Sequence, residues 1–171
     1  MLYYTGIGSR QTPDADLSQM TIIASNLEPT GFILRSGGAK GADTAFENGV
    51  TEEDHKEIYL PWKGFNNSKS SRYTITKEAL ELAAHYHPAW SRCSPTARSF
   101  HARNCYQVLG QDLNTPTQFV LCWTPDGKIA GGTGQAMRIA IDRGIPVINM
   151  ATPGWSITFD KLTQSILAET I

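Results

Sequence analysis

A glycine-rich turn at residues 36–43 constrains the fold more than any other feature of the sequence. It follows an apolar run at residues 32–34 and opens a helix-like stretch at residues 44–48. At such a junction the first backbone N–H groups of the helix are free, the helix dipole adds positive charge, and glycine lets an anion come close. The turn therefore predicts a phosphate site, whose residues would be Ser36, Gly37, Gly38, Ala39, Gly41 and Asp43.

A second glycine turn follows the apolar run 119–123 and precedes an amphipathic helix. Its candidate ligand-binding residues are Gly131, Gly132, Thr133, Gly134 and Gln135. Glycine also serves strand exits and close helix packing without any ligand, so one turn alone would be weak evidence. Two such turns favour a nucleotide site. Neither matches the Walker or the Gly-x-Gly-x-x-Gly pattern, which disfavours an ordinary ATPase or a hydride-transfer enzyme.

Alternating strand and helix patterns predict the architecture. Strands are expected near residues 2–7, 32–35, 57–60, 119–123 and 145–150, with amphipathic helices between and after them. This alternation implies parallel pairing in a three-layer α/β sandwich with a mainly parallel sheet of about five or more strands. The length of 171 residues fits a single domain over residues 1–171.

Ligands in such sheets bind beyond the carboxyl ends of the strands, where several polar residues are expected. Gly8, Ser9 and Arg10 follow the first strand, and Arg10 either meets an anion or is an ordinary surface arginine. Asp43 either binds ribose hydroxyls or simply favours the helix dipole. Trp62 either stacks on a base or packs under its own loop. The glycine turns and Arg10 can thus converge on one crevice.

The helix predicted at residues 95–109 adds three polar candidates to this site. They are Arg98, Arg103 and Asn104. The alternative interpretation is a solvated helix face.

Composition limits the partners. The net charge is −1, from 15 basic and 16 acidic residues, which lacks the footprint of a general DNA or membrane binder. No apolar segment approaches the roughly 18 residues that span a bilayer, and the first residues do not resemble a signal peptide. We expect a cytoplasmic protein with no membrane partner.

Cysteine and histidine spacing predicts no metal site. The cysteines are Cys93, Cys105 and Cys122, an odd number that fits no Cys-x-x-Cys pattern. The histidines that could suggest zinc are His85, His87 and His101, but no cysteine or carboxylate completes a ligand set at familiar spacing.

Three ordered motifs resemble known families. Residues 36–43 resemble the Ser-Gly-x-Ala-x-Gly-x-Asp signature of the DNA-processing protein A (Smf) branch, and residues 100–104 resemble its Phe-x-x-Arg-Asn segment. Residues 119–135 resemble the strand and Gly-Gly-x-Gly-Thr turn of the Lonely Guy nucleotide hydrolases. Both branches belong to the SLOG superfamily, and the resemblance covers roughly residues 2–150.

The resemblance implies a Rossmann-like fold, a homodimer, and binding of nucleotides, nucleotide-derived signals or, in one branch, single-stranded DNA. Lonely Guy enzymes hydrolyse the N-glycosidic bond of nucleoside 5′-monophosphates with an arginine and a glutamate. Arg103 matches the arginine, but the threonine and glutamate positions fall on Gln135 and Arg138. The carboxylate that would stabilise an oxocarbenium charge is therefore missing, unless Asp43, Glu47 or Asp126 replaces it.

We therefore expect a protein that binds a nucleotide or nucleotide-derived signal, as a sensor or sequestering protein that requires no cofactor. The alternatives are a nucleotide N-glycoside hydrolase, with Arg103, Asp43 and Glu47 as candidate catalytic residues, and a binder of single-stranded DNA, which the near-neutral charge does not favour.

Overall fold

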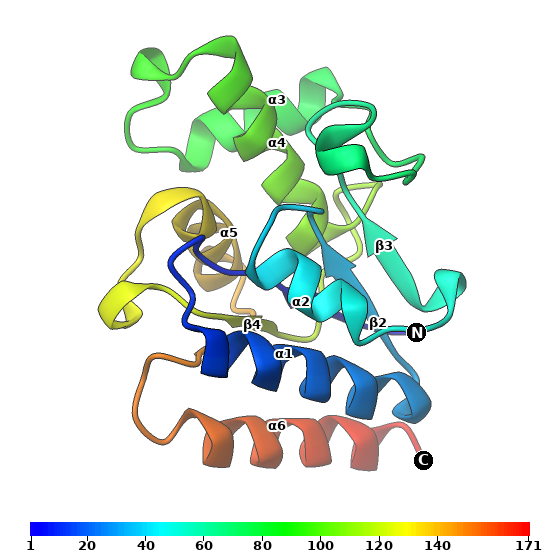
Figure 1. Ribbon diagram of the computed structural model, residues 1–171. Helices are drawn as coiled ribbons and strands as arrows, with labels where there is room; N and C mark the ends of the chain where they lie inside the picture. The colour runs from blue at the N-terminus through cyan, green and yellow to red at the C-terminus, as the bar shows by residue number, and fades with distance from the viewer.

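Five parallel strands form the centre of the protein in the computed structural model, which describes residues 1–171 (Figure 1). The strands are β1 (Leu2–Gly6), β2 (Phe32–Ser36), β3 (Lys56–Ile58), β4 (Val120–Cys122) and β5 (Val147–Asn149). Their order in the sheet is β3-β2-β1-β4-β5, and every neighbouring pair is parallel. This order matches the doubly wound arrangement of nucleotide-binding Rossmann folds.

Six helices cover the two faces of the sheet. They are α1 (Asp14–Leu27), α2 (Ala42–Asn48), α3 (Lys77–Tyr86), α4 (Pro95–Leu109), α5 (Gly131–Asp142) and α6 (Trp155–Glu169). Helices α1, α2 and α6 share one hydrophobic core with the sheet, while α3, α4 and α5 share the other. Figure 1 shows α6 running beside α1. None of the helices combines the length and apolar content that a membrane span needs. The predicted three-layer α/β sandwich is confirmed.

The apolar run at residues 119–122 contributes side chains to both hydrophobic cores. Successive side chains of a strand point to opposite faces. Phe119 and Leu121 accordingly join the core under α1 and α6, and Val120 and Cys122 join the core under α4 and α5. All four are fully buried, as expected for a central parallel strand with both faces covered.

Aromatic rings fill the core beneath α6. The Phe119 ring stacks on Tyr4 with centroids 5.6 Å apart, and it meets Phe32 and Phe159 edge to face at 5.6 and 5.7 Å. These geometries are the favourable ones for aromatic pairs. Phe119 thus joins β1, β2 and α6 through one side chain.

The observed element boundaries differ from the predicted ones in one place that matters for the site. Residues 131–135 were expected to form a turn before the helix, but they form the first turn of α5 itself. Gly134 and Gln135 are therefore buried inside the helix, and only the preceding residues lie at its open end.

We predict that Phe119→Ala lowers the free energy of unfolding by about 3–5 kcal/mol, because a buried ring is lost and a cavity remains. The measurement is urea unfolding followed by circular dichroism. Ile157→Ala is the matched control, since the Ile157 side chain lies on α6 and the residue is 62% exposed. It should change stability by no more than about 0.5 kcal/mol. Equal effects of the two substitutions would contradict this assignment of the core.

Candidate functional site

A cavity of about 380 Å³ opens where the chain leaves β1 and β4 at the carboxyl edge of the sheet. The predicted residues that line it are Gly8, Ser9, Arg10, Ala39, Asp43, Arg103, Asn104, Gly131, Gly132 and Thr133. Its other lining residues, which the sequence did not single out, are Ile7, Gln11, Phe100, Gln107 and Ala130. Segments far apart in the sequence thus meet around one space.

The topology of the sheet explains why the cavity lies there. Strands β1 and β4 are neighbours, yet β1 leads to α1 on one face of the sheet and β4 leads to α5 on the other. The two connections diverge and leave a crevice, which is the usual ligand site of doubly wound sheets. Backbone bonds from Ile7 to Leu121 and from Ser9 to Trp123 hold the first loop beside the end of β4.

The N-terminus of α5 faces this crevice. The N–H groups of Gly131, Gly132 and Thr133 make no hydrogen bond within the protein, whereas the Gly134 N–H donates to the Ala130 carbonyl oxygen. No side chain caps this helix end. Free amides together with the helix dipole attract anions. The exposed Arg10 lies on the loop after β1 and lines the same cavity.

The first glycine turn makes hydrogen bonds and packing contacts with other groups of the protein. The Ala39 N–H donates to a carboxylate oxygen of Asp43 at 3.2 Å, and the Ser36 hydroxyl donates to the Gly6 carbonyl oxygen at 2.6 Å. A side chain on Gly38, whose φ is +69°, would meet Leu60 at 2.8 Å. Of the eight residues in this turn, only Ala39 and Asp43 line the cavity.

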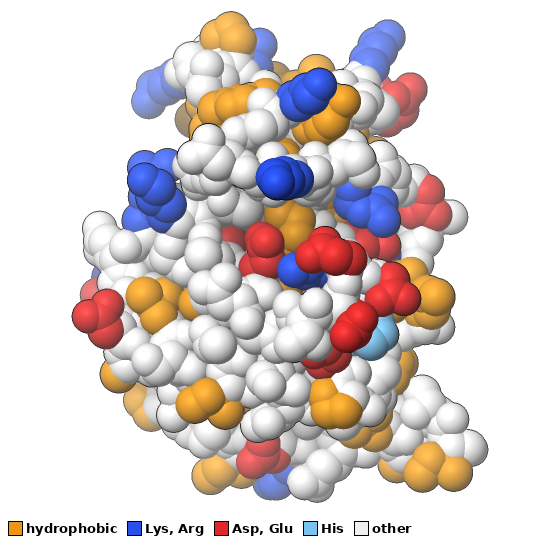
Figure 2. Space-filling model, turned by 45° about the vertical axis from the view of Figure 1, so that its right-hand side comes forward, with side chains coloured by type: hydrophobic (Ala, Val, Ile, Leu, Met, Phe, Trp, Pro, Cys, Tyr) orange, Lys and Arg blue, Asp and Glu red, His pale blue; other side chains and the backbone are white.

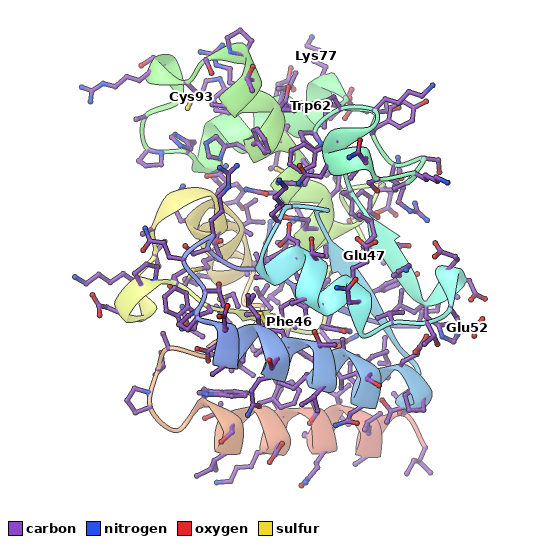
Figure 3. All side chains as sticks on the ribbon, viewed as in Figure 1. Phe46, Glu47, Glu52, Trp62, Lys77 and Cys93 are labelled. Atoms are coloured by element: carbon purple, nitrogen blue, oxygen red, sulfur yellow. The ribbon has the colours of Figure 1, made fainter.

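The remaining predicted residues lie outside the cavity. They are Ser36, Gly37, Gly38, Gly41, Glu47, Trp62, Arg98, Gly134 and Gln135. Figure 3 shows Glu47 on α2 and Trp62 in the upper part of the molecule. The Trp62 ring packs on Phe65 and on the lining residue Phe100, both with centroids 5.2 Å apart. Trp62 therefore packs against the lining residue Phe100 and does not line the cavity itself.

Two of these outer residues have clear structural roles. Arg98 donates to the Trp90 carbonyl oxygen at 3.1 Å, and its guanidinium lies 4.9 Å from the centre of the Trp90 ring. Gln135 donates to the Ala83 carbonyl oxygen at 3.0 Å and accepts a bond from Arg138. Arg98 therefore ties the segment between α3 and α4 to α4, and Gln135 ties α5 to α3; neither lines the cavity.

Arg103 and Asn104 connect the two glycine turns. The buried Arg103 guanidinium donates through Nη1 to the carbonyl oxygens of Gly37 and Tyr59, and through Nε to the Asn104 side chain. Asn104 donates in turn to the Gly132 carbonyl oxygen at 2.9 Å. The Nη2 group of Arg103 makes no hydrogen bond within the protein, so it is the donor left for a ligand.

Asp43 is the only carboxylate that lines the cavity. Burial raises its pKa from 3.8 to about 6, although the nearby Arg103 charge and the Ala39 amide act in the opposite direction. Above about pH 6 it is an ionised acceptor. Asp43 lies in the first turn of α2, and its negative charge suits a hydroxyl donor better than a phosphate.

The sequence analysis did not identify Gln107 as a lining residue, because its place at the cavity depends on the tertiary structure. It follows Arg103 by four residues and so shares its face of α4. Its side-chain oxygen is buried without a hydrogen-bond partner. A buried acceptor of this kind normally finds a donor, which a bound ligand could supply. Helical spacing from Arg103 was the one sequence signal that could have found it.

No family model and no curated protein matches this sequence. A solved structure of DNA processing protein A from Helicobacter pylori, described for its single-stranded DNA binding mode, is similar to this chain with a TM-score of 0.56 at 20% identity. The fold resembles that of DNA processing protein A. The match covers 86% of this chain and 64% of the length of that one. At this identity the likeness concerns the fold.

Asp43 gives a prediction for the pH dependence of stability. Because its pKa is raised in the folded state, its protonation stabilises the fold below about pH 4, and this contribution is lost as the pH rises to about 6. Relative to Asp43→Asn, wild type should lose on the order of 3 kcal/mol across that window. Urea unfolding at several pH values measures this difference. The exposed Asp54→Asn variant is the control, and a flat difference for Asp43→Asn would refute the prediction.

Proposed function

We propose that this protein binds a small nucleotide in the cavity between the β1 and β4 loops. The observation that carries the proposal is the uncapped N-terminus of α5, with three free amides, at the switch point of the sheet. The cavity of about 380 Å³ falls within the range of small-molecule sites. Phosphate is the ligand group that this helix end would recognise.

The phosphate would lie against the amides of Gly131, Gly132 and Thr133, with Arg10 supplying a charge-assisted hydrogen bond. Arg10 is exposed, so it can turn toward an incoming anion without breaking an internal contact. The free Nη2 of Arg103 adds a second donor from α4.

The remaining lining groups suit a sugar and a base. The ionised Asp43 would accept a hydrogen bond from a ribose hydroxyl, and the unpaired side-chain oxygen of Gln107 would accept another donor. Phe100 supplies an apolar surface at the cavity edge. A cavity lined by both acceptors and free amides suits a nucleotide better than inorganic phosphate.

Binding without hydrolysis is the function that this donor set supports best. Glycoside hydrolysis ordinarily uses a pair of carboxylates, and Asp43 stands alone in the cavity while Glu47 lines a different groove. We expect no free base when nucleoside monophosphates are incubated with the protein. Base release that Asp43→Asn abolishes would establish the hydrolase instead.

We predict that Gly132→Asp weakens nucleotide binding by at least tenfold, because its carboxylate would repel the phosphate and occupy the free amides. A charged hydrogen bond is worth about 1.5–3 kcal/mol, or roughly a 10- to 100-fold change in affinity. A side chain at Gly132 meets no atom within 4 Å, so the fold should persist. Isothermal titration with a panel of nucleoside monophosphates measures the change.

Gly132→Ala is the matched control for this substitution. It adds the same Cβ atom without the charge, and it should bind nucleotide within about threefold of wild type. Circular dichroism checks that both variants remain folded. If Gly132→Asp binds as tightly as Gly132→Ala, the helix end does not hold the phosphate.

Single-stranded DNA is the second candidate, because the similar solved structure is described for binding it. A groove of about 780 Å³ on the other side of the first glycine turn is lined by Lys40, Lys56, Lys69 and Arg72, along with serines and asparagines. However, Lys56 pairs with Glu53 at 3.1 Å and Arg72 lies 3.7 Å from Glu57. Figure 2 shows acidic and basic side chains close together on one face. Lys40 and Lys69 are left as free cations.

Competition separates the two candidates. We predict that a thymidine oligonucleotide binds more weakly than the best mononucleotide at 0.15 M salt, because two free lysines neutralise few phosphates. Fluorescence anisotropy of a labelled oligonucleotide measures its affinity. Tight binding with a steep salt dependence, lost in Lys40→Ala/Lys69→Ala but kept in the exposed Lys77→Ala control, would favour the DNA function.

The homodimer implied by the resemblance stays a prediction. Arg103 is buried in its own protomer and is unavailable to a partner.

A further inference from the structure

A cysteine and two histidines lie together outside the nucleotide cavity. His87 caps the end of α3, Cys93 lies on the segment that joins α3 to α4, and His101 lies on α4. One potential ligand atom from each residue lies within 4.8 Å of the other two. Figure 3 labels Cys93 at the outer end of the molecule on this connecting segment. These residues form what we call the Cys93 cluster.

The spacing of the Cys93 cluster is close to that of a zinc site. The Cys93 sulfur lies 3.8 Å from each ring nitrogen of His87, and the rings of His87 and His101 have centroids 4.3 Å apart. In a tetrahedral zinc site with Zn–S near 2.3 Å and Zn–N near 2.0–2.1 Å, sulfur and nitrogen lie about 3.5 Å apart. Small side-chain rotations would therefore bring the ligand atoms into place.

An unpartnered nitrogen is the second observation that points to a ligand. The Nδ1 atom of His101 is buried and makes no hydrogen bond. Buried imidazole nitrogens ordinarily have a partner. His87 Nδ1 accepts a bond from the Ala89 N–H at 3.0 Å, and a metal ion would replace this neutral donor.

Cys93 is the accessible thiol of the chain. Cys105 and Cys122 are buried, and burial raises the pKa of each thiol to about 12. Cys93 is half-buried, as are His87 and His101.

We propose that Cys93, His87 and His101 bind one Zn²⁺ ion, with water as the fourth ligand. One thiolate and two imidazoles select Zn²⁺ over the hard cations Mg²⁺ and Ca²⁺, which take oxygen ligands. The ion would tie the α3–α4 connection to α4, the helix that also carries Arg103 and Asn104. This proposal is independent of the nucleotide site.

Cobalt titration tests the proposal directly. We expect metal-free protein to bind one equivalent of Co²⁺ with a thiolate-to-cobalt charge-transfer band and the strong visible bands of tetrahedral cobalt, all removed by added Zn²⁺. Cys93→Ser should abolish the charge-transfer band. His101→Gln should weaken binding by more than about 100-fold, since even neighbours of a ligand contribute 10- to 100-fold.

His85→Gln is the matched control, because His85 is exposed on α3 two residues before His87 and is not part of the Cys93 cluster. It should bind Co²⁺ as wild type does, and circular dichroism should show all variants folded. Absence of the charge-transfer band in wild type, or its persistence in Cys93→Ser, would overturn the proposal.

Alkylation gives an independent measurement. Cys93 should be the thiol that reacts with iodoacetamide in the folded protein, and Zn²⁺ should slow this reaction at least tenfold in wild type. In His101→Gln the protection should disappear. Equal alkylation rates with and without Zn²⁺ in wild type would show that the three residues only make a thiol–imidazole contact.

Discussion

The buried guanidinium of Arg103 is the interaction on which the site depends. A charge removed from water is costly unless hydrogen bonds and an opposite charge compensate it. Arg103 finds both, in the carbonyl oxygens of Gly37 and Tyr59 and in the nearby carboxylate of Asp43. Through Asn104 it also fixes the backbone of Gly132. One side chain of α4 thereby sets the distance between two turns that leave different strands.

The two glycine turns, both predicted from the sequence to bind phosphate, have different environments in the structure. In the first turn the Ala39 N–H already donates to the Asp43 carboxylate. Its glycines serve close packing, since a side chain on Gly37 would collide with Arg103 and Gln107. The second turn is uncapped, and open space surrounds Gly131 and Gly132. The cavity therefore has a carboxylate beside the first turn and free amides at the second.

Helix α4 connects the two candidate ligand sites. Its side chains Phe100, Arg103 and Gln107 line the cavity at the carboxyl edge of the sheet, while His101 belongs to the Cys93 cluster. An ion bound by that cluster would hold the start of α4 against the end of α3. Arg103 lies two residues after His101 on the same helix, so the two candidate sites share one structural element.

Periodicity and glycine placement determined the fold, because buried parallel strands and amphipathic helices leave strong local patterns. The positions of the loops after the strands also predicted that Arg10 and the two glycine turns meet at one edge of the sheet, and the motif resemblance added Arg103 and Asn104. Only the tertiary structure decided which glycine turn stays open, since this depends on where the Asp43 side chain turns and on what Gly38 packs against. The same holds for Cys93 and His101, which lie eight residues apart in sequence and meet only because the connecting segment folds back on α4. Local sequence carries no record of such contacts, because packing between distant elements creates them.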